Sequence, residues 1–180
     1  SLDTLRFVVS NTTEAGIVLD DKDSFDGLPN TYPGKLTKFL YERYTVFSGE
    51  KDKGLIILPV ELIEDNGKKL SECVLTLADI WNLPPEFKDW VKENNIFCST
   101  LVDRIVTGYP KGEAENICKE LGYDDRLIDV GEPFALWIIE SERNISAELP
   151  LDKIGLPVVF TDNQKPYRER KVRIDRKSVV

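Results

Sequence analysis

Short apolar runs alternate with longer amphipathic stretches along the first hundred residues of the chain. Apolar runs at residues 6–10 and 55–58 predict buried strands, and the continuous second run is typical of a sheet covered on both faces. Apolar residues at helical spacing predict helices around Leu36 and Leu70. A third apolar run, residues 101–106, predicts another buried strand. This order of strands and helices is that of a parallel α/β sheet.

The most regular helical pattern lies between the second and third apolar runs. Pro84 and Pro85 follow it and open a shorter predicted helix. The apolar residues of the longer helix share one face, which we expect to pack against the sheet. They are Leu70, Cys73, Val74, Leu77, Ile80 and Trp81.

The second half of the chain is predicted to contain strands without helices between them. A helix is expected first at residues 114–121, closed by Gly122. Strands then follow, and they predict a mainly antiparallel extension of the sheet. A last helix is predicted at residues 167–174, directly after Pro166. The three predicted strands lie at residues 127–130, 134–140 and 158–161.

Composition indicates an ordinary globular domain. The chain has 180 residues, of which 41% are apolar and 31% charged, enough for one compact core. No apolar run approaches the ~20 residues that cross a bilayer, and the first residues lack a signal-peptide pattern. The cysteines at positions 73, 98 and 118 lie far apart, as small core residues do in a reducing compartment. We therefore expect a cytoplasmic protein with no membrane partner.

Several classes of chemistry are disfavoured by what the sequence lacks. The chain has no histidine, which excludes Ser-His and Cys-His nucleophiles and argues against zinc. It has no GxGxxG and no GxxxxGK[ST] motif to cradle a phosphate. The net charge of −8 argues against nucleic acid, although residues 165–177 hold seven Lys or Arg. That basic stretch is interpreted as a helix docked on an acidic body, or as an end created by truncation.

Charged residues at three places leave two interpretations open. Asp103 and Arg104 interrupt the third apolar run, either as ion-paired residues at a strand end or as part of a ligand site at a sheet's carboxyl edge. The acidic residues of segment 61–65 are either a solvated loop or an acid pair. Lys171 lies in a basic stretch, where most lysines are on the protein surface. From the residues alone, neither interpretation is excluded.

The order of six stretches narrows these alternatives. The stretches are residues 10–17 (SNTTEAGI), 32–37 (YPGKLT), 57–67 (ILPVELIEDNG), 101–106 (LVDRIV), 132–140 (EPFALWIIE) and 166–172 (PYRERKV). In this order and spacing they resemble the tagaturonate reductases (altronate oxidoreductases) of the mannitol dehydrogenase family, which are polyol-specific long-chain dehydrogenases. The resemblance implies NAD-dependent interconversion of the sugar acids tagaturonate and altronate without a metal.

The resemblance also implies roles for individual residues. Lys171 matches the family's catalytic lysine, the general acid and base on the substrate's alcohol oxygen, and Asp103 matches a carboxylate that positions it. A lysine serves as a base near neutral pH only when burial or nearby cations lower its pKa. The implied cofactor-binding residues are Asn11, Thr13 and Glu14, and the implied substrate-binding residues are Glu61, Asn66 and Arg168.

The resemblance divides the chain into three parts. Residues 1–166 are expected to be the C-terminal portion of an NAD-binding Rossmann-like domain, with the additional strands at 125–162. Residues 167–174 are expected to begin a helical domain, and 175–180 to be a tail of uncertain origin. The family's nucleotide fingerprint lies upstream of Phe7, so we expect a fragment that is inactive alone.

Other functions are not excluded by the sequence. One is a non-catalytic binding or regulatory module on the same scaffold. Another is a related fructuronate or mannitol dehydrogenase. The sequence gives no prediction of the oligomeric state.

Overall fold

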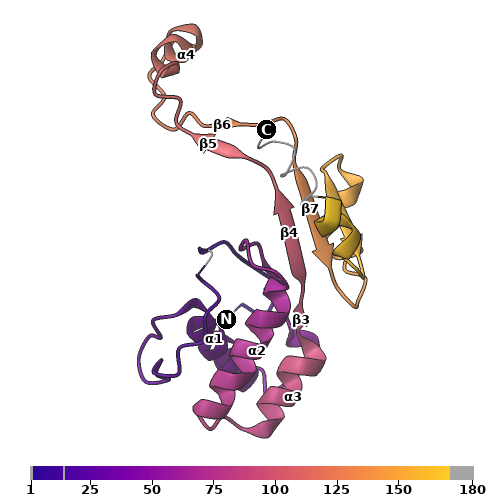
Figure 1. Cartoon of the computed structure of the whole chain (residues 1–180). Helices are drawn as coiled ribbons and strands as arrows, with labels where there is room; N and C mark the ends of the chain where they lie inside the picture. The colour runs from indigo at the N-terminus through magenta and orange to yellow at the C-terminus, as the bar shows by residue number, and fades with distance from the viewer. Residues whose placement is uncertain (1, 14, 171–180) are drawn as a thin grey trace.

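A computed structural model describes residues 2–13 and 15–170 of the chain. Three helices pack on one face of a parallel three-stranded sheet, and an arm projects from the opposite end of the molecule (Figure 1). The sheet has the order β1 (Phe7–Ser10), β2 (Ile56–Pro59) and β3 (Ile96–Phe97). The helices are α1 (Tyr32–Val46), α2 (Asn66–Ile80) and α3 (Pro85–Asn94), and a 3-10 turn, η1 (Lys51–Lys53), precedes β2.

A second sheet covers the other face. It has the order β4 (Ser99–Asp103), β7 (Leu136–Glu140) and β8 (Val158–Thr161), with the 3-10 turn η2 (Leu151–Lys153) before β8. Only Cys98 separates β3 from β4, so the chain passes directly from one sheet into the other. The predicted α/β class with a parallel sheet is confirmed. The added strands differ from the prediction, because they form a separate sheet instead of extending the first one, and because β4 and β7 are antiparallel but β7 and β8 are parallel. Of the predicted strand at 127–130, residues 127–129 are not in a strand.

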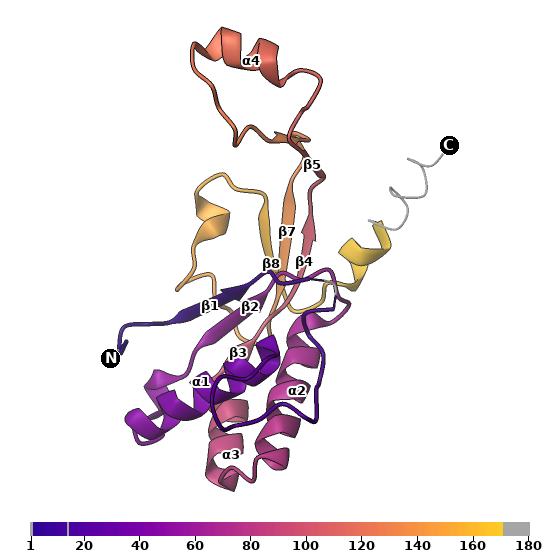
Figure 2. The same ribbon diagram turned by 90° about the vertical axis from the view of Figure 1, so that its left-hand side faces the viewer.

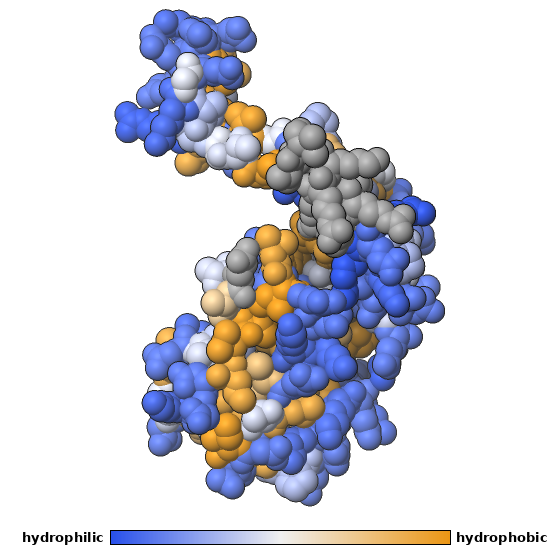
Figure 3. All heavy atoms as spheres, in the orientation of Figure 1, coloured by the Kyte–Doolittle hydropathy of each residue, from blue (hydrophilic) through white to orange (hydrophobic). Residues whose placement is uncertain are grey.

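The arm comprises residues 104–135 and extends away from both sheets (Figure 2). It contains β5 (Val106–Gly108), α4 (Ala114–Leu121) and β6 (Val130–Gly131), and β5 pairs with β6 alone among the described strands. Figure 3 shows apolar surface at the base of this arm and on the body below it. The arm's exposed large apolar side chains are Ile105, Val106, Tyr109, Leu121, Tyr123, Leu127, Val130 and Phe134.

The prediction of one buried strand at residues 101–106 is therefore wrong in its second half. The strand β4 ends at Asp103, and Ile105 is 61% exposed. A short apolar run has the same composition in a core strand and in a ribbon that leaves the body. The arm begins where the pairing of β4 with β7 stops.

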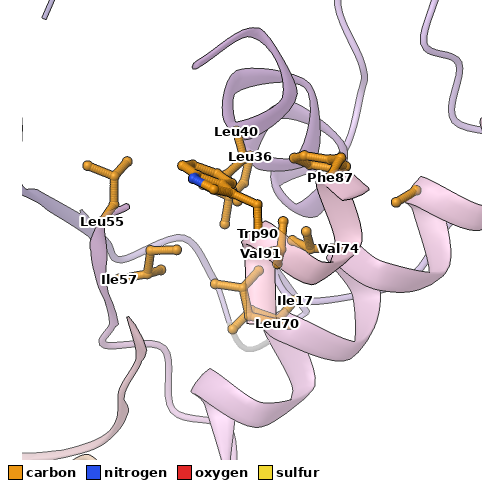
Figure 4. Close-up of a cluster of buried hydrophobic side chains, with 11 residues drawn as sticks. Ile17, Leu36, Leu40, Leu55, Ile57, Leu70, Val74, Phe87, Trp90 and Val91 are labelled. Atoms are coloured by element: carbon orange, nitrogen blue, oxygen red, sulfur yellow. The ribbon is translucent and has the colours of Figure 1, made fainter. Parts of the chain in front are cut away.

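Strand β2 is the centre of the core because both of its faces are buried. Leu55 and Ile57 face the helices, within the cluster that Figure 4 shows with side chains from α1, α2 and α3. Ile56 and Leu58 face the second sheet, where they pack with Ile139. The continuous apolar run at 55–58 thus has the covering on both faces that its sequence predicts.

Local sequence signals explain where several helices begin and end. The Thr31 hydroxyl accepts a hydrogen bond of 3.0 Å from the Gly34 N–H and caps α1. Pro85 stands in the first turn of α3. Gly122 ends α4 with a φ of 78°, the left-handed conformation that glycine adopts without strain. Residues 165–170 are also helical, so this helix begins before Pro166 and residues 171–174 lie outside the described part.

Two predicted buried surfaces are only partly buried. On α2 the buried face is formed by Leu70, Val74, Leu77 and Ala78, whereas Ile80 is 40% exposed, because the helix ends there. Strand β1 lies at an edge of its sheet, and Val9 is 59% exposed. In the part of the chain that the structure describes, no helix is long and apolar enough to cross a membrane.

Replacing Leu77 with alanine should reduce the free energy of unfolding by about 2–5 kcal/mol, because its side chain is fully buried and its removal leaves a cavity. Urea denaturation measures the loss. Ile80→Ala on the same helix is the control and should cost less than about 0.5 kcal/mol. Equal losses in the two variants would contradict the observed packing of α2.

Asp23 closes the loop before α1. Its buried carboxylate accepts hydrogen bonds from the Asn30 N–H (2.7 Å), the Thr31 N–H (3.0 Å) and the Thr31 hydroxyl (2.6 Å). Burial raises the pKa of Asp23, but these hydrogen bonds outweigh it, and the pKa is lowered overall. The carboxylate therefore stabilises the fold at neutral pH, and this contribution is lost as the pH falls through the lowered pKa.

Asp23→Asn should cost roughly 1–3 kcal/mol at pH 7, because it removes acceptor capacity from three donors. The difference from the unmodified chain should shrink as the pH falls below the usual range for aspartate. Thermal unfolding between pH 7 and pH 3 measures both effects. Asp26→Asn, at an exposed position of the same loop, should change the stability little at either pH.

Candidate functional site at the carboxyl edge of the parallel strands

Polar residues from three separate segments meet where the parallel strands end. Ser10 is the last residue of β1, Glu61 follows β2, and Thr100 lies in β4, which continues from β3. All three side chains are buried. In open α/β sheets ligands bind outside the carboxyl ends of the strands, so this edge is the candidate functional site.

Glu61 joins the ends of β1 and β2. Its Oε1 accepts hydrogen bonds from the Thr12 N–H (3.1 Å) and the Thr12 hydroxyl (2.9 Å), and its Oε2 accepts one from the Ser10 hydroxyl (3.1 Å). Only 3% of Glu61 is exposed. Hydrogen bonds to an ionised group are stronger than neutral ones, so this carboxylate fixes the chain after β1.

Asn66 joins β2 to β4. Its Nδ2 donates to the main-chain oxygens of Pro59 (3.0 Å), Glu61 (3.0 Å) and Thr100 (3.1 Å). Its Oδ1 accepts from the N–H groups of Gly67 and Thr100, both at 2.8 Å. The side chain is fully buried, so its amide is used entirely within the protein.

A close approach of α2 to the sheet makes this arrangement possible. A Cβ at Gly67 would lie 2.2 Å from the main-chain oxygen of Cys98. The helix can therefore begin beside the junction of β3 and β4 only with glycine at this position. Asp65, just before the helix, adopts a φ of 53°, which turns the chain sharply into α2.

Tyr32 lies beside the same cluster. It is the first residue of α1, and its hydroxyl is buried. Burial raises the pKa of Tyr32, and the negative charge of Glu61 raises it further. The phenol therefore stays protonated at neutral pH.

Arg168 closes the outer side of the site. Its guanidinium forms ion pairs with Glu64 and with Asp65, the latter at 2.8 Å. Burial lowers the pKa of Arg168, but the two carboxylates outweigh this effect and raise it. A cavity of about 280 Å³ lies beneath, lined by residues 61–65 and 100–102 together with Gln164 and Arg168.

The structure brings some of the predicted site residues together. Glu61 and Asn66 are in direct contact, and Glu61 lines the same cavity as Arg168. Asp103 ends β4, three residues and so about 10 Å along the strand from Thr100, and it is not among the residues that line the cavity.

The remaining predicted residues either are exposed or lie outside the described part of the chain. Asn11 and Thr13 are exposed on the loop after β1. Glu14 and Lys171 lie outside the described residues. Sequence reasoning did not select Ser10, Thr12, Tyr32, Thr100 or Gln164, since hydroxyl and amide residues are too common in loops and strand ends to stand out.

Comparison with known proteins places this fold. The family model for the mannitol dehydrogenase Rossmann domain matches residues 3–153. The chain belongs to the mannitol dehydrogenase family. The resemblance of its six ordered stretches to this family is thereby confirmed.

Relatives within the family are altronate oxidoreductases. The enzyme of Yersinia enterocolitica is 52% identical over 94% of this chain and 35% of its own length. The enzyme of Bacillus subtilis is 50% identical over 97% of this chain and 36% of its own length. The chain thus spans about a third of the length of the curated relatives it matches.

Solved structures of the family share the fold. Pseudomonas fluorescens mannitol 2-dehydrogenase, solved as a ternary complex with NAD and D-mannitol, is 24% identical with a TM-score of 0.69. The likeness covers 93% of this chain and 35% of that one. A D-sorbitol dehydrogenase in substrate-free form matches with a TM-score of 0.66 at 22% identity, over 92% of this chain and 35% of that one.

Replacing Asn66 with alanine should reduce the free energy of unfolding by at least about 2 kcal/mol, because several buried main-chain groups lose their partner at once. Chemical denaturation measures the loss. Asn116→Ala, at an exposed position of α4, should change stability by less than about 0.5 kcal/mol. A loss as small as that in Asn66→Ala would mean that the amide is dispensable for the fold.

Proposed function

We propose that this chain is part of an NAD-dependent oxidoreductase that interconverts tagaturonate and altronate. The observation that carries the proposal is the meeting of three family stretches, 10–17, 57–67 and 166–172, at one sheet edge, in a chain half identical to altronate oxidoreductases. A non-catalytic module on the same scaffold would need the packed core but not this cluster of polar residues at the carboxyl edge of the sheet. The oxidoreductase is therefore favoured over a non-catalytic module.

The residues at this edge fit part of a bound NAD. Asn11 and Thr13 offer exposed amide and hydroxyl groups beside the end of β1, as a ribose or a carboxamide requires. Glu14 is proposed to join them. When bound, NAD supplies the acceptor for the hydride. The glycine-rich turn that holds a pyrophosphate is not found in this sequence.

The proton is proposed to move at the substrate's alcohol oxygen. As hydride leaves the adjoining carbon of altronate, Lys171 takes the proton from that oxygen, and it returns the proton in the reverse direction. Asp103 is proposed to position this lysine. The role of Asp103 is supported by its place at the end of β4, on the carboxyl side of Thr100.

Arg168 and Asn66 are proposed to serve the sugar acid in different ways. A guanidinium matches a carboxylate in two parallel hydrogen bonds, but that of Arg168 is shared between Glu64 and Asp65. Binding of a substrate carboxylate would have to exchange one of these partners. Asn66 has no free hydrogen-bonding group, which favours an indirect role in shaping the loop that follows β2.

A small sugar acid is accordingly the proposed partner molecule, with no nucleic acid and no membrane. We further propose a cytoplasmic location. The free state of Cys73, Cys98 and Cys118 supports a reducing compartment.

A grafted enzyme tests the proposal. In it, the altronate oxidoreductase of Bacillus subtilis carries this chain in place of its own matching segment. We expect NADH oxidation that depends on tagaturonate, followed by absorbance of the reduced nicotinamide. Lys171→Ala should lower kcat about 10²–10⁴-fold, the usual contribution of a general acid or base. The 180-residue chain by itself should show no turnover.

Lys165→Ala is the matched control, because Lys165 is an exposed lysine of the helix at residues 165–170. It should leave kcat within about twofold. Turnover of fructuronate or fructose in preference to tagaturonate would assign the domain to a related dehydrogenase. Absence of turnover with all three would favour the non-catalytic module.

A further inference from the structure

Both oxygens of the Glu61 carboxylate are used by the segment that follows β1. Thr12 donates to Oε1 through its N–H and its hydroxyl, and Ser10 donates to Oε2. With 3% of the residue exposed, little of it is left to contact a substrate. The carboxylate acts on the loop of residues 11–16.

Thr12 is also held from its other side. A Cβ at Gly16 would lie only 1.7 Å from the Thr12 Oγ1, so the chain at Gly16 passes directly against this hydroxyl. The Gly16 N–H donates to the main-chain oxygen of Thr13 (2.8 Å), and the next residue, Ile17, is buried in the core. The Thr12 hydroxyl is thus contacted both by Glu61 and by the chain at Gly16.

The residues on either side of Thr12 belong to the same exposed segment. Asn11, Thr12 and Thr13 are all exposed, but the Thr12 N–H and hydroxyl are bound to the Glu61 carboxylate. The two residues that flank Thr12 are those proposed above to contact NAD.

We infer that Glu61 is a positioning residue for the nucleotide, and not a ligand of the sugar acid as its sequence position suggests. By binding the Thr12 N–H and hydroxyl it fixes the chain on either side, where Asn11 and Thr13 are proposed to contact the cofactor. The inference rests on the proposed function for the identity of that cofactor. The hydrogen bonds that carry it are independent of any activity.

The main chain of Glu61, unlike its carboxylate, is connected to Asn66, a predicted substrate-binding residue. The Glu61 carbonyl accepts from the Asn66 amide, which also binds the main chain of Thr100. A change at the carboxylate is therefore expected to disturb the loop after β1 first, since the contacts on the substrate side use the main chain and remain.

Amide hydrogen exchange on the 180-residue chain tests the positioning role. Glu61→Gln should speed exchange of the Thr12 N–H by at least about tenfold, because a neutral amide replaces the charged acceptor. The Val8 N–H, within β1, should keep its rate. Thr12→Val, which leaves Glu61 in place, is a milder variant and should speed the same exchange. Glu42→Gln, an exposed position on α1, is the control. An unchanged Thr12 rate in Glu61→Gln would overturn the inference.

Kinetics of the grafted enzyme separate positioning from substrate contact. Glu61→Gln should raise KM for NADH about tenfold and leave KM for tagaturonate within about twofold. Thr12→Val should act in the same direction, and the double variant should be no worse than Glu61→Gln alone. A rise confined to KM for tagaturonate would show that Glu61 contacts the substrate and would contradict the inference. A grafted enzyme without any turnover would refute the proposed function, and the exchange rates would then decide the role of Glu61.

Discussion

A buried carboxylate and a buried amide hold the carboxyl edge of this sheet together. Main-chain groups at strand ends have lost their ladder partners, and leaving them unpaired away from water costs about 1–3 kcal/mol each. Glu61 and Asn66 supply the missing partners to three segments distant in sequence. Because the two residues are also bonded to each other, none of these segments can shift without breaking a hydrogen bond in another.

The packing around β2 gives this edge a rigid support. The side chains of residues 55–58 alternate between the helical layer and the second sheet, so both layers pack against the same four residues. Dense interiors of this kind transmit displacement rather than absorb it. The polar edge is in this way supported by both layers of the core.

The spacing of apolar residues predicts most strands and helices of the body, but it does not predict where the chain leaves the body. The run at 55–58, the helix α1 and the Gly122 cap follow from local pattern and backbone chemistry. The exposure of Ile105 does not, because a short apolar run does not reveal whether its pairing partner lies in the core. Likewise, the stretch that contains Asn66 indicates a functional site. The hydrogen bonds of the Asn66 side chain with Pro59 and Thr100 could not be predicted, because they join segments that meet only in the folded chain.

The arm and the body of the molecule should differ in their free energies of local unfolding. Its ribbon has few paired residues and shares no ladder with either sheet, so it should open at a much lower free energy than the body. A protease would cut first within residues 104–135 and leave the two sheets intact. The exposed apolar side chains of the same segment also make it the part of the described chain most prone to self-association during expression, and added charge there should improve solubility without touching the carboxyl edge.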